Sequence, residues 1–484
     1  MLRASVVSGF IAVFVAITLI AGLASLLAPS VVFADDGGGD GGGGGGGGGG
    51  DGGGSGGGGP SDAWNPFAQS APGYGRRSRR SARRACRCRS AWNCSCRSRR
   101  ASRARGYTYP VQARQVLPAT QSRQIRTAEI VVAGLTAAEL DTLRGERYVV
   151  VGERQSALLG RPVARLQLPR GTSARRALVR VRTLSPLALA ARNDRYARSA
   201  RTLYRAAGQP CGRACEHFKL TAWERPDRSC TSGFAIGVID TRVDTAHPAL
   251  SNAGVETFVA RSADREASTD EHGTGVVSLL VGNEEAGIAG LAPGVRVFAA
   301  DAFHADGRGA GAEAYDLLTA FDWLAQNGVR IVNLSFSGPD NAVLKETVER
   351  SLARGMVLVA AAGVPASGRT QGYPARYDGV VAVSSVDPRL RPSRLSTRGD
   401  HIAFSAPGVG LTVAGSGKAL RRVDGTSFAA PFVTAAFARG LAARANQSDV
   451  TRLLSANARD LGAPGRDPIF GWGLVQFSGL PRCG

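Results

Sequence analysis

From Phe234 onward, short apolar runs alternate with longer amphipathic stretches. The apolar runs are continuous, which is typical of strands that are buried on both faces. Because these strands alternate with helical patterns, they predict an α/β fold in which a parallel sheet is covered by helices on both faces. The predicted strands are residues 235–239, 295–300, 331–334, 357–361 and 380–383, and the clearest helices are residues 311–327 and 341–354.

A smaller folded unit is predicted at residues 125–190. Its strand and helix patterns follow the order β-α-β-β-α, which is typical of a small α+β, ferredoxin-like domain. It contains no catalytic constellation. Residues 191–229 are Arg-rich and are predicted to be a connector, and the cysteines at 211, 215 and 230 suit a disulfide. The patterns of the small unit are strands at 129–133, 148–151 and 163–168 and helices at 136–144 and 173–183.

The N-terminal region is expected to be disordered, apart from an apolar run in residues 1–34. That run is long enough to span a bilayer, and Val32-Phe33-Ala34 resembles a signal-peptidase site, so a signal peptide and a membrane anchor both stay open. Either one predicts export, to a secreted, periplasmic or membrane-anchored location at the cell envelope. Residues 35–60 are nearly all glycine and predict a flexible linker.

Residues 61–124 form an Arg/Ser/Cys-rich segment of low complexity. From Arg76 to Arg105 it has no acidic residue, which suits either a membrane or anionic envelope polymer as a partner, or a solvated basic linker. Its four cysteines are at positions 86, 88, 94 and 96. In an exported chain this C-x-C spacing favours disulfides over a thiolate metal site.

Net charge is +22 over 484 residues, but residues 231–484 are close to neutral. A neutral α/β region argues against nucleic acid as its specific partner. The candidate chemistry lies in this region. Asp240 ends a strand, His272 opens a glycine-led helix, and Ser427 opens an Ala-rich helix after Gly425-Thr426. An orienting acid, a base and a nucleophile at such positions predict acyl transfer.

These motifs resemble the subtilisin-like serine proteases, the subtilase family. The resemblance covers about residues 230–478 and implies a subtilisin-like domain at 230–484. It rests on I-G-V-I-D-T at 236–241, H-G-T-G at 272–275 and G-T-S-F-A-A-P at 425–431 in the family's order. Segments 290–294, 332–335, 405–408 and 471–475 are similar as well.

The resemblance implies that Ser427 attacks the peptide carbonyl, that His272 carries its proton, and that Asp240 orients the imidazole. It also implies that residues 307–311 and 335–338 pair with an extended substrate. The implied substrate-binding residues are Ser335, Phe336, Ser337, Gly338, Gly309, Ala362 and Gly363.

Two positions depart from the family's pattern. Arg242 stands where the family usually has glycine, and a positive φ there would strain it. Val364 stands where the family has an asparagine that donates to the oxyanion, so the backbone N–H of Ser427 remains as the expected donor. One lost donor lowers turnover by about 10²–10³, a magnitude that comes from a subtilisin and is borrowed for this chain.

The sequence therefore predicts an exported serine endopeptidase that works through an acyl-enzyme on polypeptide substrates, slowed by a non-standard oxyanion hole. The alternative is a pseudoprotease that binds peptides or acts as a scaffold. Residues 125–190 resemble the family's propeptide, cut between about 190 and 230, and a permanently attached interaction domain is the competing interpretation. No cofactor is expected for catalysis and no metal ligands are predicted. Structural calcium is common in the family, but no acidic cluster assigns a site.

Overall fold

The computed structural model describes residues 86–90, 93–96, 128–201, 210, 215–227, 231–307, 309–365, 371–443 and 446–480. The apolar run of residues 1–34 and the glycine tract lie outside these residues, as does most of the Arg-rich segment. Residues 1–115 and 116–484 form separate units. In the first, β1 (Cys86–Ser90) and β2 (Asn93–Cys96) pair antiparallel, which sets Cys86 opposite Cys96 and Cys88 opposite Cys94.

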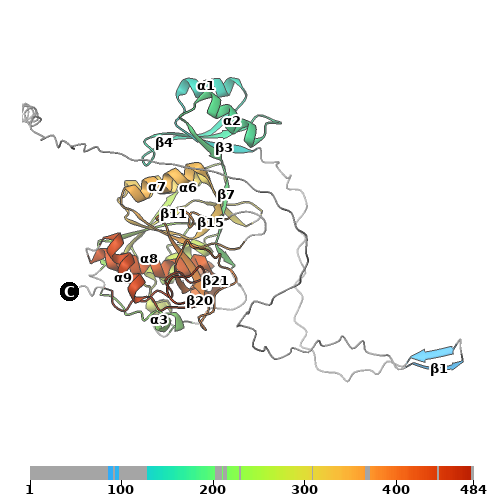
Figure 1. Cartoon of the computed structure of the whole chain (residues 1–484), viewed down its shortest axis with the longest axis vertical. Helices are drawn as coiled ribbons and strands as arrows, with labels where there is room; N and C mark the ends of the chain where they lie inside the picture. Colours follow the sequence, from blue (N-terminus) through green and yellow to red (C-terminus); the bar gives the residue numbers. More distant parts are fainter. Residues whose placement is uncertain are drawn as a thin grey trace, which may run out of the picture. The chain divides into compact units, whose positions relative to one another are not determined.

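A parallel sheet forms the centre of the second unit (Figure 1). Its seven strands lie in the order β10-β11-β9-β14-β16-β18-β19, and every neighbouring pair is parallel. The central strands are almost wholly buried, as their continuous apolar runs predict. The strands are β10 (Val255–Val259), β11 (Arg296–Asp301), β9 (Ala235–Asp240), β14 (Ile331–Leu334), β16 (Val357–Ala361), β18 (Val381–Val386) and β19 (Ile402–Pro407).

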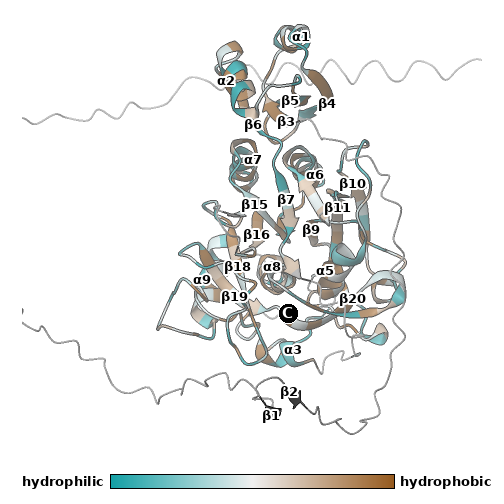
Figure 2. Ribbon diagram, turned by 90° about the vertical axis from the view of Figure 1, so that its right-hand side faces the viewer, coloured by the Kyte–Doolittle hydropathy of each residue, from teal (hydrophilic) through white to brown (hydrophobic). Residues whose placement is uncertain are grey.

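Helices cover both faces of this sheet, and each face has its own hydrophobic core. One core contains α5 (Glu271–Val281) and α8 (Thr426–Ala442). The other contains α6 (Ala314–Gln326) and α7 (Ala342–Ala353). Helix α8 lies against β14, β16, β18 and β19, and it is the apolar helix at the centre of the molecule in Figure 2. The α/β fold predicted from the sequence is confirmed. We call residues 231–480 the large domain.

A four-stranded antiparallel sheet with two helices forms the small domain, residues 128–192. Its order is βαββαβ, so a fourth strand, β6, completes the pattern expected from the sequence. The small domain has its own core, built from the inner faces of β3, β5, α1 and α2. Its elements are β3 (Glu129–Ala133), α1 (Ala137–Gly145), β4 (Val149–Ser156), β5 (Arg161–Gln167), α2 (Ala174–Leu184) and β6 (Leu189–Arg192).

The chain between the two domains contains regular structure where the sequence predicts a plain connector. β7 (Arg195–Arg198) and β8 (Ala200–Arg201) run into the large domain, and α3 (Glu216–Leu220) follows. Figure 2 shows β7 descending from the small domain between the strands of the large one. Cys215 of this region is disulfide-bonded.

Smaller elements surround the edge of the main sheet where the candidate site lies. Among the described residues, no helix combines the length and the apolar character needed to cross a membrane. The remaining elements are β12 (Phe303–Ala305), β13 (Ala310–Glu313), β15 (Phe336–Pro339), β17 (Gln371–Tyr373), β20 (Val409–Ala414), β21 (Leu420–Gly425), α9 (Gln447–Asn457) and the 3₁₀ turns Pro248–Leu250, Glu284–Ala286 and Ser416–Lys418.

Candidate active site

The structure brings together the acid and the base that the sequence singles out. Asp240 is the last residue of β9 and His272 lies in the first turn of α5. His272 Nδ1 lies 2.6 Å from Asp240 Oδ1. Since the carboxylate can only accept, this contact assigns the proton to Nδ1 and leaves Nε2 as a buried acceptor without a partner. The ring packs against Phe428 of α8, with 5.0 Å between ring centroids.

The residue after His272 must be glycine because the backbone of Gly273 lies very close to that of Thr241. A Cβ on Gly273 would lie 2.3 Å from the carbonyl oxygen of Thr241, so any other residue would push α5 away from the end of β9. In return, Gly273 N–H donates to Thr241 Oγ1 at 2.8 Å. The hydroxyl of the D-T motif thus ties the start of the histidine's helix to the strand that carries the aspartate.

Ser427 lies in the first turn of α8 and is fully buried. Its Oγ donates to the carbonyl oxygen of Ser335 at 2.8 Å. Pro431 lies one turn further on and has no N–H, so the carbonyl of Ser427 lacks its usual helical donor. Ser335 Oγ donates to that carbonyl at 2.9 Å instead. The residue before β15 is therefore bonded to the serine in both directions.

Residues 195–201 occupy the cleft in front of the serine, and we call them the cleft segment. β7 pairs antiparallel with β13 on one side and with β15 on the other. After Ser199 the chain continues as β8, in which Ala200 lies opposite Gly425 of β21. A Cβ on Gly425 would lie 2.6 Å from the Cα of Ala200, so this glycine allows the close approach. The cleft segment thus passes the start of α8 as two short strands with a bend at Ser199 between them.

The carbonyl of Ser199 faces the start of α8. It accepts hydrogen bonds from the backbone N–H of Ser427 and from Thr426 Oγ1, both at 3.2 Å. Thr426 Oγ1 in turn accepts from Gly363 N–H at 3.3 Å. The threonine hydroxyl has one proton, and this pattern directs it to the Ser199 carbonyl. A peptide carbonyl therefore lies between two donors beside the serine hydroxyl.

Val364 follows Gly363 and is partly buried. Its apolar side chain has no hydrogen-bond donor. Because Thr426 Oγ1 already reaches the Ser199 carbonyl, the position opposite this carbonyl is not without a side-chain donor. Thr426 belongs to the G-T-S motif, but the sequence gives no sign that its hydroxyl points into the cleft. This contact was missed because it depends on the rotamer of one side chain.

Tyr196 anchors the cleft segment. It is fully buried, meets Phe336 edge-on with 6.0 Å between ring centroids, and donates its hydroxyl proton to the carbonyl of Pro339 at 3.0 Å. A Cβ on Gly338 would lie 2.4 Å from the ring, so glycine there makes room for an aromatic side chain. Ser199 Oγ lies 3.1 Å from Ser337 Oγ, which leaves a confined space for the side chain of this residue.

Some of the predicted substrate-binding residues contact the cleft segment, and others do not. Ser335, Phe336, Ser337 and Gly338 line the cleft segment. Gly363 lies beside Ser337, whereas Ala362 bonds to Val383 and Thr397 of the domain itself. Gly309 lies in the turn before β13, and no pairing with the cleft segment is found for it.

Arg242 is not strained, because its φ is not positive. Its guanidinium pairs at 3.0 Å with Asp270, the residue at the N-cap position of α5. The strain considered for this position from the sequence is therefore absent. An arginine is accommodated where the family usually has glycine, and it lies beside the start of the histidine's helix.

Ion pairs hold the small domain against the large one. Arg154 pairs with Asp322, and Arg265 of the large domain lies 3.0 Å from Glu129 and 2.7 Å from Glu313. Asp316 is buried in the same region and accepts from Ser262 N–H and Oγ. The pKa of Asp316 is raised to about 7, mainly by burial and in part by the nearby Glu313, against the lowering effect of the bonds from Ser262.

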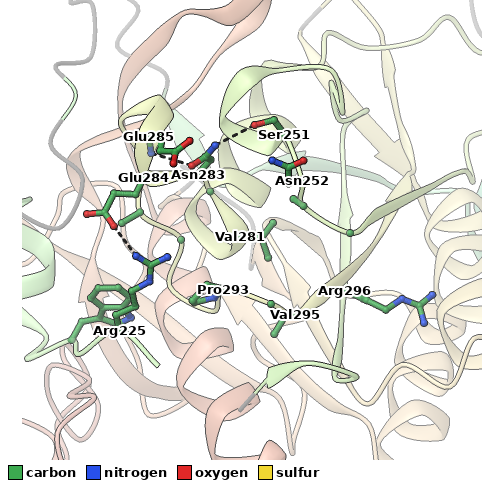
Figure 3. Close-up of a pocket in the computed structure, with 17 residues that line it drawn as sticks. Arg225, Ser251, Asn252, Val281, Asn283, Glu284, Glu285, Pro293, Val295 and Arg296 are labelled. Atoms are coloured by element: carbon green, nitrogen blue, oxygen red, sulfur yellow. Dashed lines mark hydrogen bonds and ion pairs between the residues drawn. The ribbon is translucent and has the colours of Figure 1, made fainter. Parts of the chain in front are cut away.

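A separate cavity of about 590 Å³ lies away from the triad (Figure 3). Two side-chain interactions join residues that line this cavity. They are an ion pair between Arg225 and Glu284 and a hydrogen bond from Asn283 to Ser251. Within the described part of the chain, no group of three or more His, Cys, Asp or Glu side chains is placed to hold a metal ion.

Comparisons with known proteins show what the sequence of the large domain is similar to. The model of the subtilase family matches residues 231–473. Minor extracellular protease Epr of Bacillus subtilis is 34% identical over 248 residues, which are 50% of this chain and 37% of Epr. Subtilisin DY of Bacillus licheniformis is 32% identical over 47% of this chain and 84% of its own. Subtilisin BL of Lederbergia lenta is 32% identical over 52% of this chain and 91% of its own.

Among solved structures, fervidolysin from Fervidobacterium pennivorans, a keratinolytic enzyme related to subtilisin, has the same fold. It aligns with a TM-score of 0.60 and 21% identity, over 74% of this chain and 62% of its own. The chain belongs to the subtilase family. It spans only about a third of the length of Epr, whose further regions have no counterpart in the match.

Proposed function

We propose that the chain is a serine endopeptidase made as an inhibited precursor, and that its first substrate is its own Ser199–Ala200 bond. One observation carries the proposal. The Ser199 carbonyl accepts from Ser427 N–H and Thr426 Oγ1, while the residues before it pair with both β13 and β15. This is how an extended substrate would be presented to Ser427, since backbone pairing positions the chain and the two donors polarise the bond.

The reaction begins when the hydroxyl of Ser427 turns from the Ser335 carbonyl to Nε2 of His272. Nε2 is free to accept because Nδ1 donates to Asp240. As Ser427 Oγ forms a bond to the Ser199 carbonyl carbon, its proton passes to Nε2. Asp240 holds the tautomer and stabilises the imidazolium that results.

The negative charge develops on the Ser199 carbonyl oxygen, where Ser427 N–H and the Thr426 hydroxyl stabilise it. The bond from Ser199 to Ala200 then breaks, and the imidazolium gives its proton to the leaving amine of Ala200. Water hydrolyses the acyl-enzyme and releases the Ser199 carboxylate. Thr426 thus supplies a donor that Val364 cannot, although a hydroxyl on a rotatable side chain is less fixed than a backbone N–H.

After the cut, the small domain and residues 193–199 would remain as a product that blocks the cleft, held by Tyr196 and by the ion pairs of the domain interface. We therefore propose that the small domain is an inhibitor that is released from the mature enzyme. A permanently attached interaction domain would instead remain bound throughout turnover.

N-terminal sequencing of purified protein tests the cut. We expect the wild type to yield a new N-terminus that begins Ala200-Arg201, and the Ser427→Ala precursor to stay whole under the same conditions. A first cut at another bond, or the same cut in pure Ser427→Ala protein, would contradict self-processing at Ser199.

Reaction with a fluorophosphonate separates the enzyme from the pseudoprotease alternative. The processed wild type should become labelled on Ser427, and the precursor should label slowly because the cleft is filled. Folded protein that neither cuts itself nor labels would favour a peptide-binding pseudoprotease, which the apolar Val364 motivates. A matched control is Ser448→Ala, since this serine is exposed on α9 and lies outside the cleft.

Export is proposed from the apolar run in residues 1–34, and the extracellular protease among the relatives supports it. Sequencing the N-terminus of the protein recovered from cells tells a cleaved signal peptide from an anchor. Binding of residues 76–105 to membranes or anionic polymer remains a prediction. Deleting them should then abolish a salt-sensitive retention on the envelope.

A further inference from the structure

Arg195 is the first residue of the cleft segment, and its guanidinium group is bound by residues of the large domain. In the pairing of β7 with β13, Arg195 lies opposite Glu313. Its side chain turns along β13 to Asp306, where Nε and Nη2 both meet the carboxylate, Nη2 at 3.2 Å from Oδ1. Nη2 also donates to the carbonyl of Ala310 at 3.3 Å. A guanidinium that meets a carboxylate through two nitrogens is fixed in direction as well as in position.

Gly311 leaves the space that this guanidinium fills. A Cβ on Gly311 would lie 2.5 Å from Arg195 Nε and 2.8 Å from its Cζ. The φ of Gly311 is not positive, so the backbone there does not itself require glycine. Glycine at this position therefore makes room for the Arg195 guanidinium and is not needed for the backbone conformation.

Asp306 belongs to the large domain and remains after the cleft segment leaves. It follows β12, and its N–H closes the β12–β13 turn on the Gly309 carbonyl at 3.1 Å. With Arg195 in place, its side chain is only 8% exposed, while that of Arg195 is 29% exposed. A carboxylate covered to this degree is stabilised by a cation opposite it, and a neutral side chain there would not replace that interaction.

We propose that Asp306 and Gly311 form a subsite that selects arginine four residues before the residue whose carbonyl is attacked, as Arg195 stands before Ser199. The preferred substrates are then polypeptides with arginine at that position. This inference rests on the proposed endopeptidase function. Arg198 offers an internal contrast, since it makes no ion pair among the residues that the structure describes.

Cleavage of three quenched peptides by the processed enzyme tests the subsite. The first has the sequence of residues 194–202, and the other two carry Arg195→Gln or Arg198→Gln. Losing a partly buried, charge-assisted contact should lower kcat/KM for the Arg195→Gln peptide by about tenfold. In the Asp306→Asn enzyme this discrimination should fall below about twofold, while the ratio for the Arg198→Gln peptide keeps its wild-type value.

Gly311→Ala is a second variant, in which the added methyl group would occupy the space of the arginine side chain. It should lower cleavage of the arginine peptide and leave little difference between that peptide and its Arg195→Gln form. If Asp306→Asn lowers cleavage of all three peptides equally, or if discrimination persists in it, the subsite is wrong.

A second measurement keeps the subsite testable if no peptide is cleaved, an outcome that would count against the proposed function alone. In the uncut Ser427→Ala precursor, amide hydrogen exchange reports how often the cleft segment detaches. We expect Arg195→Gln and Asp306→Asn each to speed exchange across residues 195–199 by about five- to tenfold, with no further gain in the double variant. Additive effects, or no change in either variant, would overturn the subsite. Matching thermal unfolding curves would show that each variant has folded.

Discussion

The candidate catalytic residues are buried and the cleft segment is partly buried, and the two differ in what holds them. Asp240, His272 and Ser427 are each fixed at the end of a strand or the start of a helix, by contacts within the large domain. The cleft segment is held mainly by backbone pairing with β13 and β15 and by two anchoring side chains, Tyr196 and Arg195. The first set requires particular residue types, whereas much of the second would form with many sequences.

This difference explains why a precursor can be both well ordered and releasable. The proposed chemistry depends on particular side chains held at the ends of elements. The cleft segment depends on strand pairing, which under the proposed self-processing is lost when the segment leaves after the cut. Substitutions made on one side at a time separate these two kinds of contact.

The largest effect is expected at the oxyanion. Thr426→Val removes the hydroxyl that reaches the Ser199 carbonyl and should slow self-processing by about 10²-fold, a magnitude based on donor loss in a subtilisin. Thr426→Ser keeps the donor and should stay within about tenfold of the wild type. Gel-based time courses of precursor loss measure both. Equal rates for Val and wild type would show that Ser427 N–H suffices alone.

The anchor of the cleft segment comes next. Tyr196→Ala removes a fully buried ring beside Phe336 and Gly338, and should weaken docking by about 2–2.7 kcal/mol, some 30- to 100-fold in exchange of the segment. Tyr196→Phe loses only the bond to the Pro339 carbonyl and should change exchange by about tenfold or less. Hydrogen exchange in the Ser427→Ala precursor measures them. Similar values for Ala and Phe would mean that packing does not anchor the segment.

A gain of activity is expected at Val364. Val364→Asn adds a donor on the far side of the oxyanion and should raise the turnover of the processed enzyme by about tenfold, less than a full donor's contribution because Thr426 already acts there. Val364→Ala removes bulk without adding a donor and serves as the control. If both variants gain equally, the valine acts by obstruction and not through a missing hydrogen bond.

The smallest effect concerns the domain interface and pH. The folded pKa of Asp316 is raised from 3.8 to about 7, mainly by burial. Between these values the folded precursor retains a proton that the unfolded chain has lost, so its free energy of unfolding falls as pH rises. Asp316→Asn should therefore stabilise the Ser427→Ala precursor at pH 8 by on the order of 1–2 kcal/mol, with less gain near pH 4. Urea unfolding at the two pH values measures it, and an equal change at both would refute the assignment.

The sequence predicted the large domain well because buried parallel strands and their helices leave continuous apolar runs, as in β9, β14 and β16. It also predicted which acid and base meet, since Asp240 and His272 both lie in motifs at element ends. It did not predict β7 and β8. Arg-Tyr-Ala-Arg-Ser-Ala-Arg carries no apolar run, and its strand character comes from partners more than a hundred residues away in the chain. The roles of Thr426 and Asp306 depend on side-chain direction, which the sequence pattern does not contain.

Pro431 has an effect at some distance from its own position. By leaving the Ser427 carbonyl without a helical donor, it recruits Ser335 Oγ, and the Ser335 carbonyl in turn receives both the Ser427 hydroxyl and the Ser199 N–H. The two bonds exist together because a carbonyl oxygen has two lone pairs. The backbone of the cleft segment and the resting hydroxyl of Ser427 are thus tied to one oxygen atom. A proline in α8 thereby fixes the residue that both of them share.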